Sequence, residues 1–456
     1  MIHSLPYVLF CMTAGIGLIV LLTARFRIPA FFALLSVALL TGFLLGMPFQ
    51  DILNAIKDGF GNILRSLGLI IVLGTTLGAL LEYNGNTRVL AIFLLRVIGE
   101  RYAALAMSVT GFIVGLPIFC DSGFIVLSGL NRSIAGRTGI SPIIMSVSLA
   151  TGLYSVHCLI PPHPGAAAAA GLYGVDFGKL ILAGMLVAVP AMLAGHAWAR
   201  YAGRKFSNAI AGEGSAQVKG SIQEQGSGEE KRSGDPSFFV AFLPIGVPIA
   251  LIAMRSFISL GKAAGSFPAQ LLDFLGEPVI ALSVGVLLVF ASRRKWAKET
   301  MTHLLTEGAE KAGGILVIIG AGGAFGAVLA ATHFGQQFGG IPALGRMGIL
   351  FPFLLSFLLK TAQGSSTVAI ITAATIVQPL LPVLGIQSES GRLLCLLSMG
   401  AGSMMISHAN DAYFWVIAKF SGLEMRTMLS VYSLASLFMG LAAFGMVCIF
   451  DWLIRF

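Results

Sequence analysis

The chain is poor in charged residues. Only 11% of its 456 residues are Asp, Glu, Lys or Arg, whereas 56% are hydrophobic and the mean hydropathy is +0.89. A soluble domain carries roughly 25% charged residues, so this deficit excludes an ordinary soluble enzyme. The net charge of +9 comes from basic residues at the ends of apolar segments, where such residues set membrane topology. Nucleic-acid binding is therefore not indicated.

Motifs of the common catalytic and nucleotide-binding classes are also absent from the sequence. It contains no G-x-S-x-G, HExxH, P-loop or GxGxxG pattern, which removes support for hydrolase, metalloprotease or ATP-driven chemistry. The five cysteines lie in apolar stretches without CxxC spacing, and we interpret them as free thiols. We expect no enzymatic activity, no cofactor and no metal site.

Apolar runs of membrane-spanning length fill most of the chain. They lie at about 6–24, 28–47, 66–83, 103–119, 141–160, 175–197, 237–258, 276–292, 312–332, 341–360, 364–383, 391–409 and 428–453. This pattern predicts an all-α polytopic membrane protein. The hydrophilic stretch 200–236 predicts a flexible linker between a first membrane repeat, 1–199, and a second, 237–456.

The two halves resemble each other. Gly74 and Gly78 match Gly322 and Gly326 at a shift of 248, and His157 then falls near a second histidine, His408, at a shift of 251. If the N-terminus faces outward and 103–131 and 341–383 are re-entrant hairpins, most basic residues face the cytoplasm. Each half then has about five crossings plus one hairpin. An odd number of crossings predicts two inverted-topology repeats.

Short polar islands interrupt the apolar runs twice in each half, at 116–123, 155–165, 361–367 and 407–411. Backbone that breaks inside a bilayer must find new hydrogen-bond partners, so it survives only where it is buried or lines a cavity. Matching interruptions in two halves are the best sequence indication of a transporter's substrate site.

Asp121 is the acidic residue of the first island. A carboxylate at membrane depth costs roughly 2.5–3.5 kcal/mol on insertion scales, which favours a functional role such as carrying a proton. The alternative is a carboxylate outside the bilayer that caps the next helix beside Ser122 and Gly123.

Two histidines, His157 and His163, flank Pro161 and Pro162 in the second island. The prolines prevent regular helix and leave carbonyl groups without partners. The imidazoles are able to bond to a substrate carboxylate or hydroxyl. The alternative is a structural role in which either ring bonds to one of the carbonyls.

The small polar turn 363–367, Gln363 to Thr367, would expose N–H groups and hydroxyls at the start of a helix, where anions bind. The alternative is a plain N-cap at Ser365 or Ser366. Lys360 would complete an anion site or extend to an interface. In the last island, Asp411 would pair with His408 or Lys419, or would couple to protons, and the sequence leaves these readings open.

Four segments resemble the signatures of the gluconate permease family, and the similarity runs along nearly the whole chain. They are LPIFCDSGF (116–124), HCLIPPHPG (157–165), IGAGGAFG (319–326) and AQGSSTVAI (362–370). The resemblance implies a bacterial inner-membrane proton symporter for gluconate and related hydroxy acids, with some members carrying D-serine or other short carboxylates. It also implies inverted repeats, an elevator-like moving domain and hairpin tips that meet near mid-membrane. A homodimer is expected by analogy alone.

We therefore expect a secondary active transporter that imports a small hydroxylated carboxylate, gluconate or a related sugar acid, with protons. The predicted substrate-binding residues are Ser122, Gly123, His157, His163, Gly364, Ser365, Ser366, Thr367, His408 and Asn410, and the predicted proton-coupling residues are Asp121 and Asp411. The alternatives are a symporter for D-serine, glycerate or another short carboxylate, a sodium-coupled carrier, and a passive carrier or channel.

Overall fold

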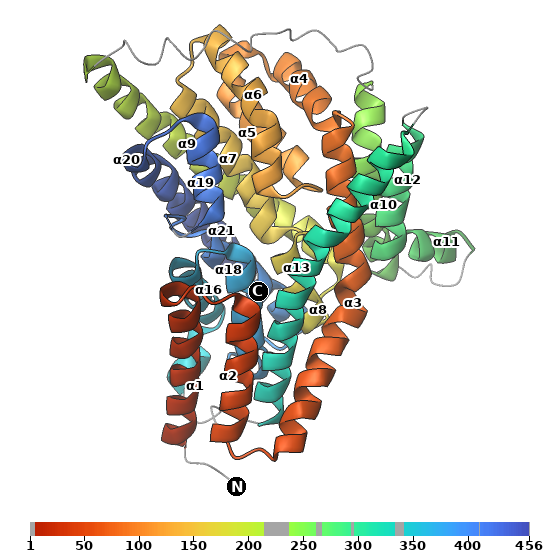
Figure 1. Ribbon diagram of the computed structural model, residues 1–456, viewed down its shortest axis with the longest axis vertical. Coiled ribbons are helices and arrows are strands. Elements are labelled where there is room, and N and C mark those ends of the chain that lie inside the picture. Colours follow the sequence, from red (N-terminus) through yellow and green to blue (C-terminus); the bar gives the residue numbers. More distant parts are fainter. Residues whose placement is uncertain are drawn as a thin grey trace.

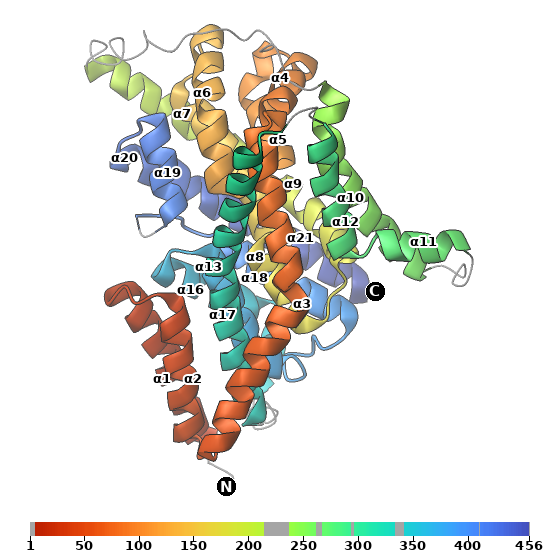
Figure 2. The same ribbon diagram turned by 45° about the vertical axis from the view of Figure 1, so that its right-hand side comes forward.

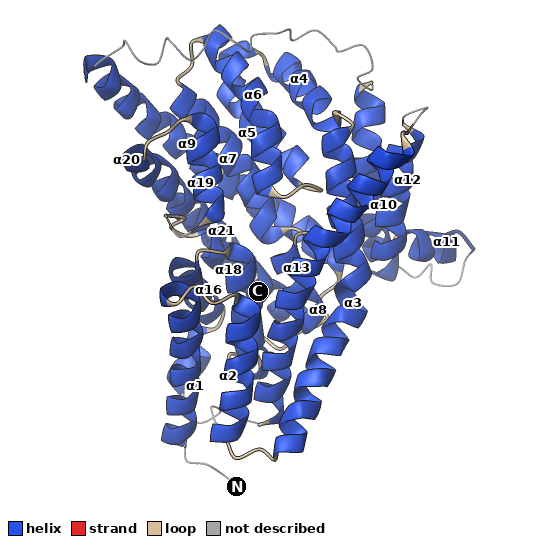
Figure 3. Ribbon diagram, in the orientation of Figure 1, coloured by secondary structure: helices blue, strands red, loops and turns tan. Residues whose placement is uncertain are grey.

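The computed structural model describes residues 5–213, 237–260, 267–292, 296–332, 342–409 and 411–455. Within these ranges the regular elements are all helices, and none is a strand (Figure 3). Six helices of the described part are long and apolar enough to cross a membrane. The all-helical, multi-pass expectation is confirmed.

Nine α-helices lie in residues 5–213, the described part of the first half. Their bounds are α1 Leu5–Val20, α2 Ala30–Leu44, α3 Phe49–Tyr83, α4 Asn86–Ile98, α5 Ala103–Gly115, α6 Cys120–Thr138, α7 Pro142–Leu159, α8 Pro164–Tyr173 and α9 Phe177–Glu213. Helix α9 continues past the predicted start of the linker at residue 200, so residues 200–213 are helical. The rest of the predicted linker, 214–236, lies outside the described residues.

The second half repeats much of this order. Its helices are α10 Phe238–Leu260, α11 Phe267–Leu275, α12 Pro278–Ala291, α13 Lys298–Ala331, α15 Pro342–Met347, α16 Leu350–Gln363, α17 Ser366–Val377, α18 Glu389–Met404, α19 Ala412–Ser421, α20 Met425–Thr427 and α21 Leu434–Arg455. In each half a long helix (α3, α13) precedes a pair of short helices (α5–α6, α16–α17). An interrupted helix (α7–α8, α18–α19) and a closing helix (α9, α21) follow.

Helices α3 and α13 pack along each other through the length of the molecule (Figure 1). They contain 35 and 34 residues. Glycines allow the close approach, because a Cβ on Gly323 would stand 2.5 Å from the carbonyl oxygen of Gly59. The Thr75 hydroxyl also donates a hydrogen bond of 2.8 Å to the carbonyl of Gly308. Each helix joins an amphipathic first segment, 49–64 in α3 and 298–311 in α13, to an apolar one without a break.

The two short-helix pairs lie in different parts of the molecule. Helices α5 and α6 occupy its upper half in the figures, whereas α16 and α17 lie lower (Figures 1 and 2). Each pair packs on the interrupted helix of its own half, and its second arm also packs on the other half: α6 on α19, and α17 on α8. The breaks of both halves are therefore brought together in the interior.

Candidate functional site

The helix pairs α5–α6 and α16–α17 are hairpins, and in each a short turn, the hairpin tip, joins the two arms. Glycine and proline end the first arm and favour this turn. Helix α5 ends at Gly115, Pro117 lies in the turn, and α6 begins at Cys120. Helix α16 is followed by its C-cap Gly364, whose φ of +81° is a left-handed conformation that glycine adopts without strain. Helix α17 then begins at Ser366.

The N-termini of α6, α8, α17 and α19 lie around these breaks, as ring contacts, the packing of a glycine and the hydrogen bonds of Lys360 show. A Cβ on Gly165, in the first turn of α8, would lie 3.3 Å from the α-carbon of Thr367 in α17. The ring of Phe119, just before α6, lies 6.3 Å from that of His157 and 6.1 Å from that of His163. Helix N-termini carry partial positive charge and free N–H groups, so their convergence favours an anion.

A buried ion pair occupies the middle of this region. The Lys360 ammonium donates to Asp411 Oδ2 at 2.6 Å and to the carbonyl of Gly364 at 2.7 Å. The two side chains are only 1% and 7% exposed. Asp411 also accepts hydrogen bonds from the Ser407 hydroxyl at 2.5 Å and, as the N-cap of α19, from the backbone N–H of Tyr413 at 3.0 Å. The ionic partner of Asp411 is thus Lys360, in place of the His408 or Lys419 that the sequence offered.

Asp121 lies in the first turn of α6, half-buried, where the charges of Asp411 and Lys360 both act on it. The Cys120 thiol is 3.7 Å from its Oδ1 atom. Two carboxylates and one ammonium therefore share this interior region. Such a set is one charge short of neutrality, which makes it suited to take up a proton.

The three predicted histidines have different surroundings. His163 donates through Nε2 to the carbonyl of Gly115 at 2.6 Å, and His408 donates through Nε2 to the carbonyl of Thr361 at 3.2 Å. Each acceptor lies at the C-terminal end of the first hairpin arm of the same half. By this contact His163, rather than His157, is the counterpart of His408. The shift of 251 that paired His157 with His408 was therefore misleading.

His157 has a different character. Its Nδ1 atom is buried and has no hydrogen-bond partner among the described residues. Its ring lies 4.8 Å from the ring of His163 and stacks at 6.4 Å on that of Tyr154. Among the described ring nitrogens of these three histidines, Nδ1 of His157 is thus the buried one that lacks a partner, and a substrate would supply it.

The polar residues of the second tip, α16–α17, also differ in whether their side chains already have partners. The Ser365 hydroxyl accepts from the backbone N–H of Val368 at 3.3 Å, which is the plain N-cap reading. Ser366 is buried beside Tyr154 and Cys158, and Thr367 is half-buried.

At the first tip, Ser122 is half-buried next to Asp121. The N–H of Gly123 is already bonded to the carbonyl of Phe119, and a Cβ there would stand 2.6 Å from Leu153. Close packing therefore accounts for this glycine. Asn410 lies outside the described residues.

Sequence reasoning placed Gln363 in the polar turn but assigned it no role, and it did not single out Tyr154. Both polar atoms of the Gln363 side chain are buried without a partner in the described part of the chain. The Lys360 ammonium lies 5.7 Å from the centre of the Tyr154 ring, within the range of a cation–π interaction. Gln363 ends an apolar helix directly before the tip, and that position was the available signal.

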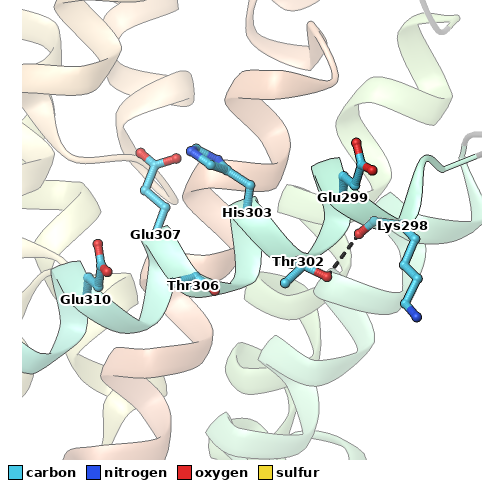
Figure 4. Close-up of a pocket in the computed structure, with 7 residues that line it drawn as sticks. All are labelled: Lys298, Glu299, Thr302, His303, Thr306, Glu307 and Glu310. Atoms are coloured by element: carbon cyan, nitrogen blue, oxygen red, sulfur yellow. Dashed lines mark hydrogen bonds between the residues drawn. The ribbon is translucent and has the colours of Figure 1, made fainter.

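A separate surface hollow of about 750 Å³ is lined by α13 alone (Figure 4). Its walls are Lys298, Glu299, Thr302, His303, Thr306, Glu307 and Glu310. One exposed helix face does not enclose a ligand, and none of these residues belongs to the group around the ion pair. We therefore place the candidate site at the four breaks.

An all-helical membrane fold with hairpins and interrupted helices around a buried polar centre defines a transporter. The profile of the GntP permease family matches residues 7–453, and the chain belongs to this family. It is a multi-pass protein of the bacterial inner membrane and not an enzyme. This agrees with the resemblance drawn from the sequence.

Named relatives cover nearly the whole chain. It is 34% identical to the gluconate permease of Pseudomonas aeruginosa, over 95% of this chain and 97% of the relative. It is 30% identical to the D-serine transporter DsdX of Escherichia coli K12, over 95% and 96%. Among solved structures, the antimetabolite efflux pump MtrF of Neisseria gonorrhoeae has the same fold, with a TM-score of 0.65, 15% identity, and coverage of 92% and 94%.

Proposed function

We propose that the protein is a secondary active transporter that imports a small hydroxylated carboxylate, gluconate or a related sugar acid, together with protons. One observation carries the proposal: four helix N-termini converge on a buried ion pair and on polar atoms that have no partner in the described residues. This arrangement suits an anion with several hydroxyl groups. The gluconate permease among the relatives supports the same substrate class.

The substrate would lie between the two tips. Its carboxylate would meet the N-terminal end of α17, formed by residues 364–367, and its hydroxyls would bond to His157, Ser122 and Asn410. His163 and His408 would act indirectly, because each holds a hairpin arm in place through a carbonyl. Gly123 would serve by allowing α6 to pack closely on α7.

Asp121 and Asp411 are the proposed proton-coupling residues. They share their surroundings with one lysine, so a proton on either carboxylate would balance the charge. Asp121 is the more exposed of the two, which suits it to exchange protons with water.

The proposed transport cycle uses two inverted repeats, 1–199 and 237–456. The repeated order of long helix, hairpin, interrupted helix and closing helix supports this division. Rocking or sliding of the hairpins and interrupted helices against α3 and α13 would expose the site alternately to the two sides. A homodimer stays a prediction.

The proposal is tested on the purified full-length protein in two steps. A thermal-shift screen against C3–C6 hydroxy acids and D-amino acids should show stabilisation by gluconate or a related acid, because a ligand of the folded state raises Tm. Proteoliposomes with an inward proton gradient should then accumulate the radiolabelled acid, and an uncoupler should abolish accumulation. Uptake that only equilibrates would identify a passive carrier or channel.

D-serine is the second candidate substrate, because a relative of similar identity is named a D-serine transporter. Stabilisation by D-serine or glycerate and not by gluconate would select this alternative. Accumulation that follows a sodium gradient, and persists without a proton gradient, would replace the proton as the driving ion.

A further inference from the structure

Pairing with Asp411 does not by itself explain why Lys360 is buried. Among the described residues with buried side chains, it is the only lysine or arginine. Moving an ammonium group out of water is expensive, and replacing such a pair by apolar side chains is often neutral or stabilising. A buried lysine beside a hairpin tip is therefore a candidate for function.

The ammonium group of Lys360 has more N–H donors than the two hydrogen bonds described for it use. An ammonium group has three N–H donors. Asp411 and the carbonyl of Gly364 take two of them, and the group also faces the ring of Tyr154. Gly364 is the turn residue of the hairpin tip. Lys360 is therefore in contact with both the tip and the charge of Asp411, so a change in either would affect it.

The charges of the groups in the site suggest how Lys360 would act on an anionic substrate. The pair of Lys360 and Asp411 is neutral, and Asp121 already adds a negative charge nearby. An entering carboxylate would add another negative charge in a buried region, which is costly unless a cation arrives with it. A proton on Asp411 removes that charge and releases the ammonium group from its present partner.

We propose that Lys360 binds the carboxylate of the substrate, and that Asp411 takes up the coupling proton when it gives up the lysine. This rests on the proposed function and assigns two roles within that site. The proton comes from water on the side from which the substrate enters, and it leaves with the substrate on the other side. Lys360 keeps its own protons throughout.

Other titratable groups face Asp411 from each neighbouring element. They are Lys360 from α16, Cys120 and Asp121 from α6, Tyr154 and Cys158 from α7, Tyr413 from α19 and Tyr432 from the π-helical turn Met428–Ser433 before α21. Thiols and phenols ordinarily ionise well above neutral pH. Asp121 and His408, whose carbonyl accepts from the backbone N–H of Asp411 at 2.8 Å, are thus the other groups that would compete for the proton, and the experiment must separate both from Asp411.

The experiment measures gluconate binding to purified protein by calorimetry between pH 5.5 and 8. Wild type should bind more tightly as pH falls, by up to tenfold per pH unit for one linked proton. Titration in buffers of different ionisation enthalpy should show up to one proton taken up per bound gluconate, and this needs no variant. Asp411→Asn should bind gluconate with little pH dependence, whereas Asp121→Asn and His408→Gln should keep the pH slope of binding.

The double variant Lys360→Met with Asp411→Asn decides the role of the lysine. It removes both charges, so the interior stays neutral and the fold is preserved, as gel filtration and thermal melting will show. If Lys360 binds the carboxylate, this variant should lose at least 100-fold in affinity. The matched control is Lys419→Met, which removes an exposed lysine of α19 and should leave affinity unchanged.

Each outcome has one meaning. Wild-type affinity in the double variant would overturn the role of Lys360, and gluconate binding without proton uptake in wild type would overturn the role of Asp411. Should wild type bind none of the screened carboxylates, the proposed function itself fails, which is a different result from either of these.

Discussion

At the scale of single residues, hydrogen-bond partners separate structural groups from those available to a ligand. His163, His408 and Ser365 have partners that fix the hairpins, whereas His157 and Gln363 carry buried atoms without partners in the described residues. A buried polar group left unpaired costs about 1–3 kcal/mol. Such a cost is tolerated where a substrate supplies the missing bonds.

Replacement of Gln363 by Leu tests this directly. The variant should raise the Tm of the substrate-free protein, because an apolar side chain of similar size removes the unpaired amide. It should also weaken gluconate binding about tenfold or more, since a hydroxyl loses its partner. Thermal melting and calorimetry measure the two effects. Gln50→Leu, at an exposed position, is the control. A stable variant with unchanged affinity would exclude Gln363 from the site.

Replacement of Asp121 by Asn tests proton coupling. The variant should lose proton-driven accumulation and retain some exchange of external for internal substrate. The reason is that Asp121, the more exposed carboxylate, would pass the coupling proton between water and Asp411, whereas exchange does not require release of that proton. Uptake and counterflow in proteoliposomes distinguish the two activities. Full accumulation by this variant would rule out Asp121 as a proton carrier.

The sequence predicted the polar islands and both carboxylates because polar residues at membrane depth stand out in an apolar chain. It did not predict the pairing of Lys360 with Asp411, since these residues lie 51 positions apart on different elements. Nor did it distinguish His157 from His163, because both flank the same prolines and only tertiary contacts assign their partners.

At the scale of elements, the close packing of α3 on α13, here called the seam, requires glycine at its contact points. The α-carbons of Gly59 and Gly323 face each other's carbonyl groups, so a methyl group at either position would clash. The sequence indicated the relation between these helices through matching glycines. It did not indicate that each helix continues through its amphipathic segment, because the change in polarity there resembles a boundary.

Two glycines of α13 provide a matched pair for this seam. Gly323→Ala should destabilise the protein by roughly 1–3 kcal/mol, because a Cβ would stand 2.5 Å from the Gly59 carbonyl oxygen. Gly314→Ala meets nothing within 4 Å and should be neutral or slightly stabilising, since alanine favours helix. Thermal melting in detergent compares them. Equal Tm values for the two variants would show that this seam is not closely packed.

At the scale of the whole molecule, the proposed inverted repeats predict opposite sides for equivalent turns. Gly136 lies in the last turn of α6, and Gln387 lies in the turn before α18; both are exposed. On a background with exposed Cys448 replaced by Ser, Gln387→Cys should react with an impermeant maleimide in intact cells. Gly136→Cys should react only after permeabilisation. Labelling of both from the same side would contradict the inverted arrangement.

The two halves also depend on each other for their interior surfaces. Helix α6 packs on α19, α17 packs on α8, and α3 packs along α13, so the candidate site contains residues from both halves. A half alone would expose the broken helices and the buried lysine to lipid without the groups that satisfy them. Sequence similarity between the halves therefore does not indicate independent folding.

Division of the chain at residue 225, within the predicted linker, tests this dependence. Fragments 1–225 and 226–456 expressed separately should be degraded or aggregate, whereas their coexpression should restore a complex that co-purifies and transports the substrate of the intact chain. The reason is that each hairpin requires the interrupted helix of the opposite half. If either fragment alone purified as a stable, monodisperse protein, the halves would fold as separate domains. The proposal that the substrate site is assembled between the two halves would then be wrong.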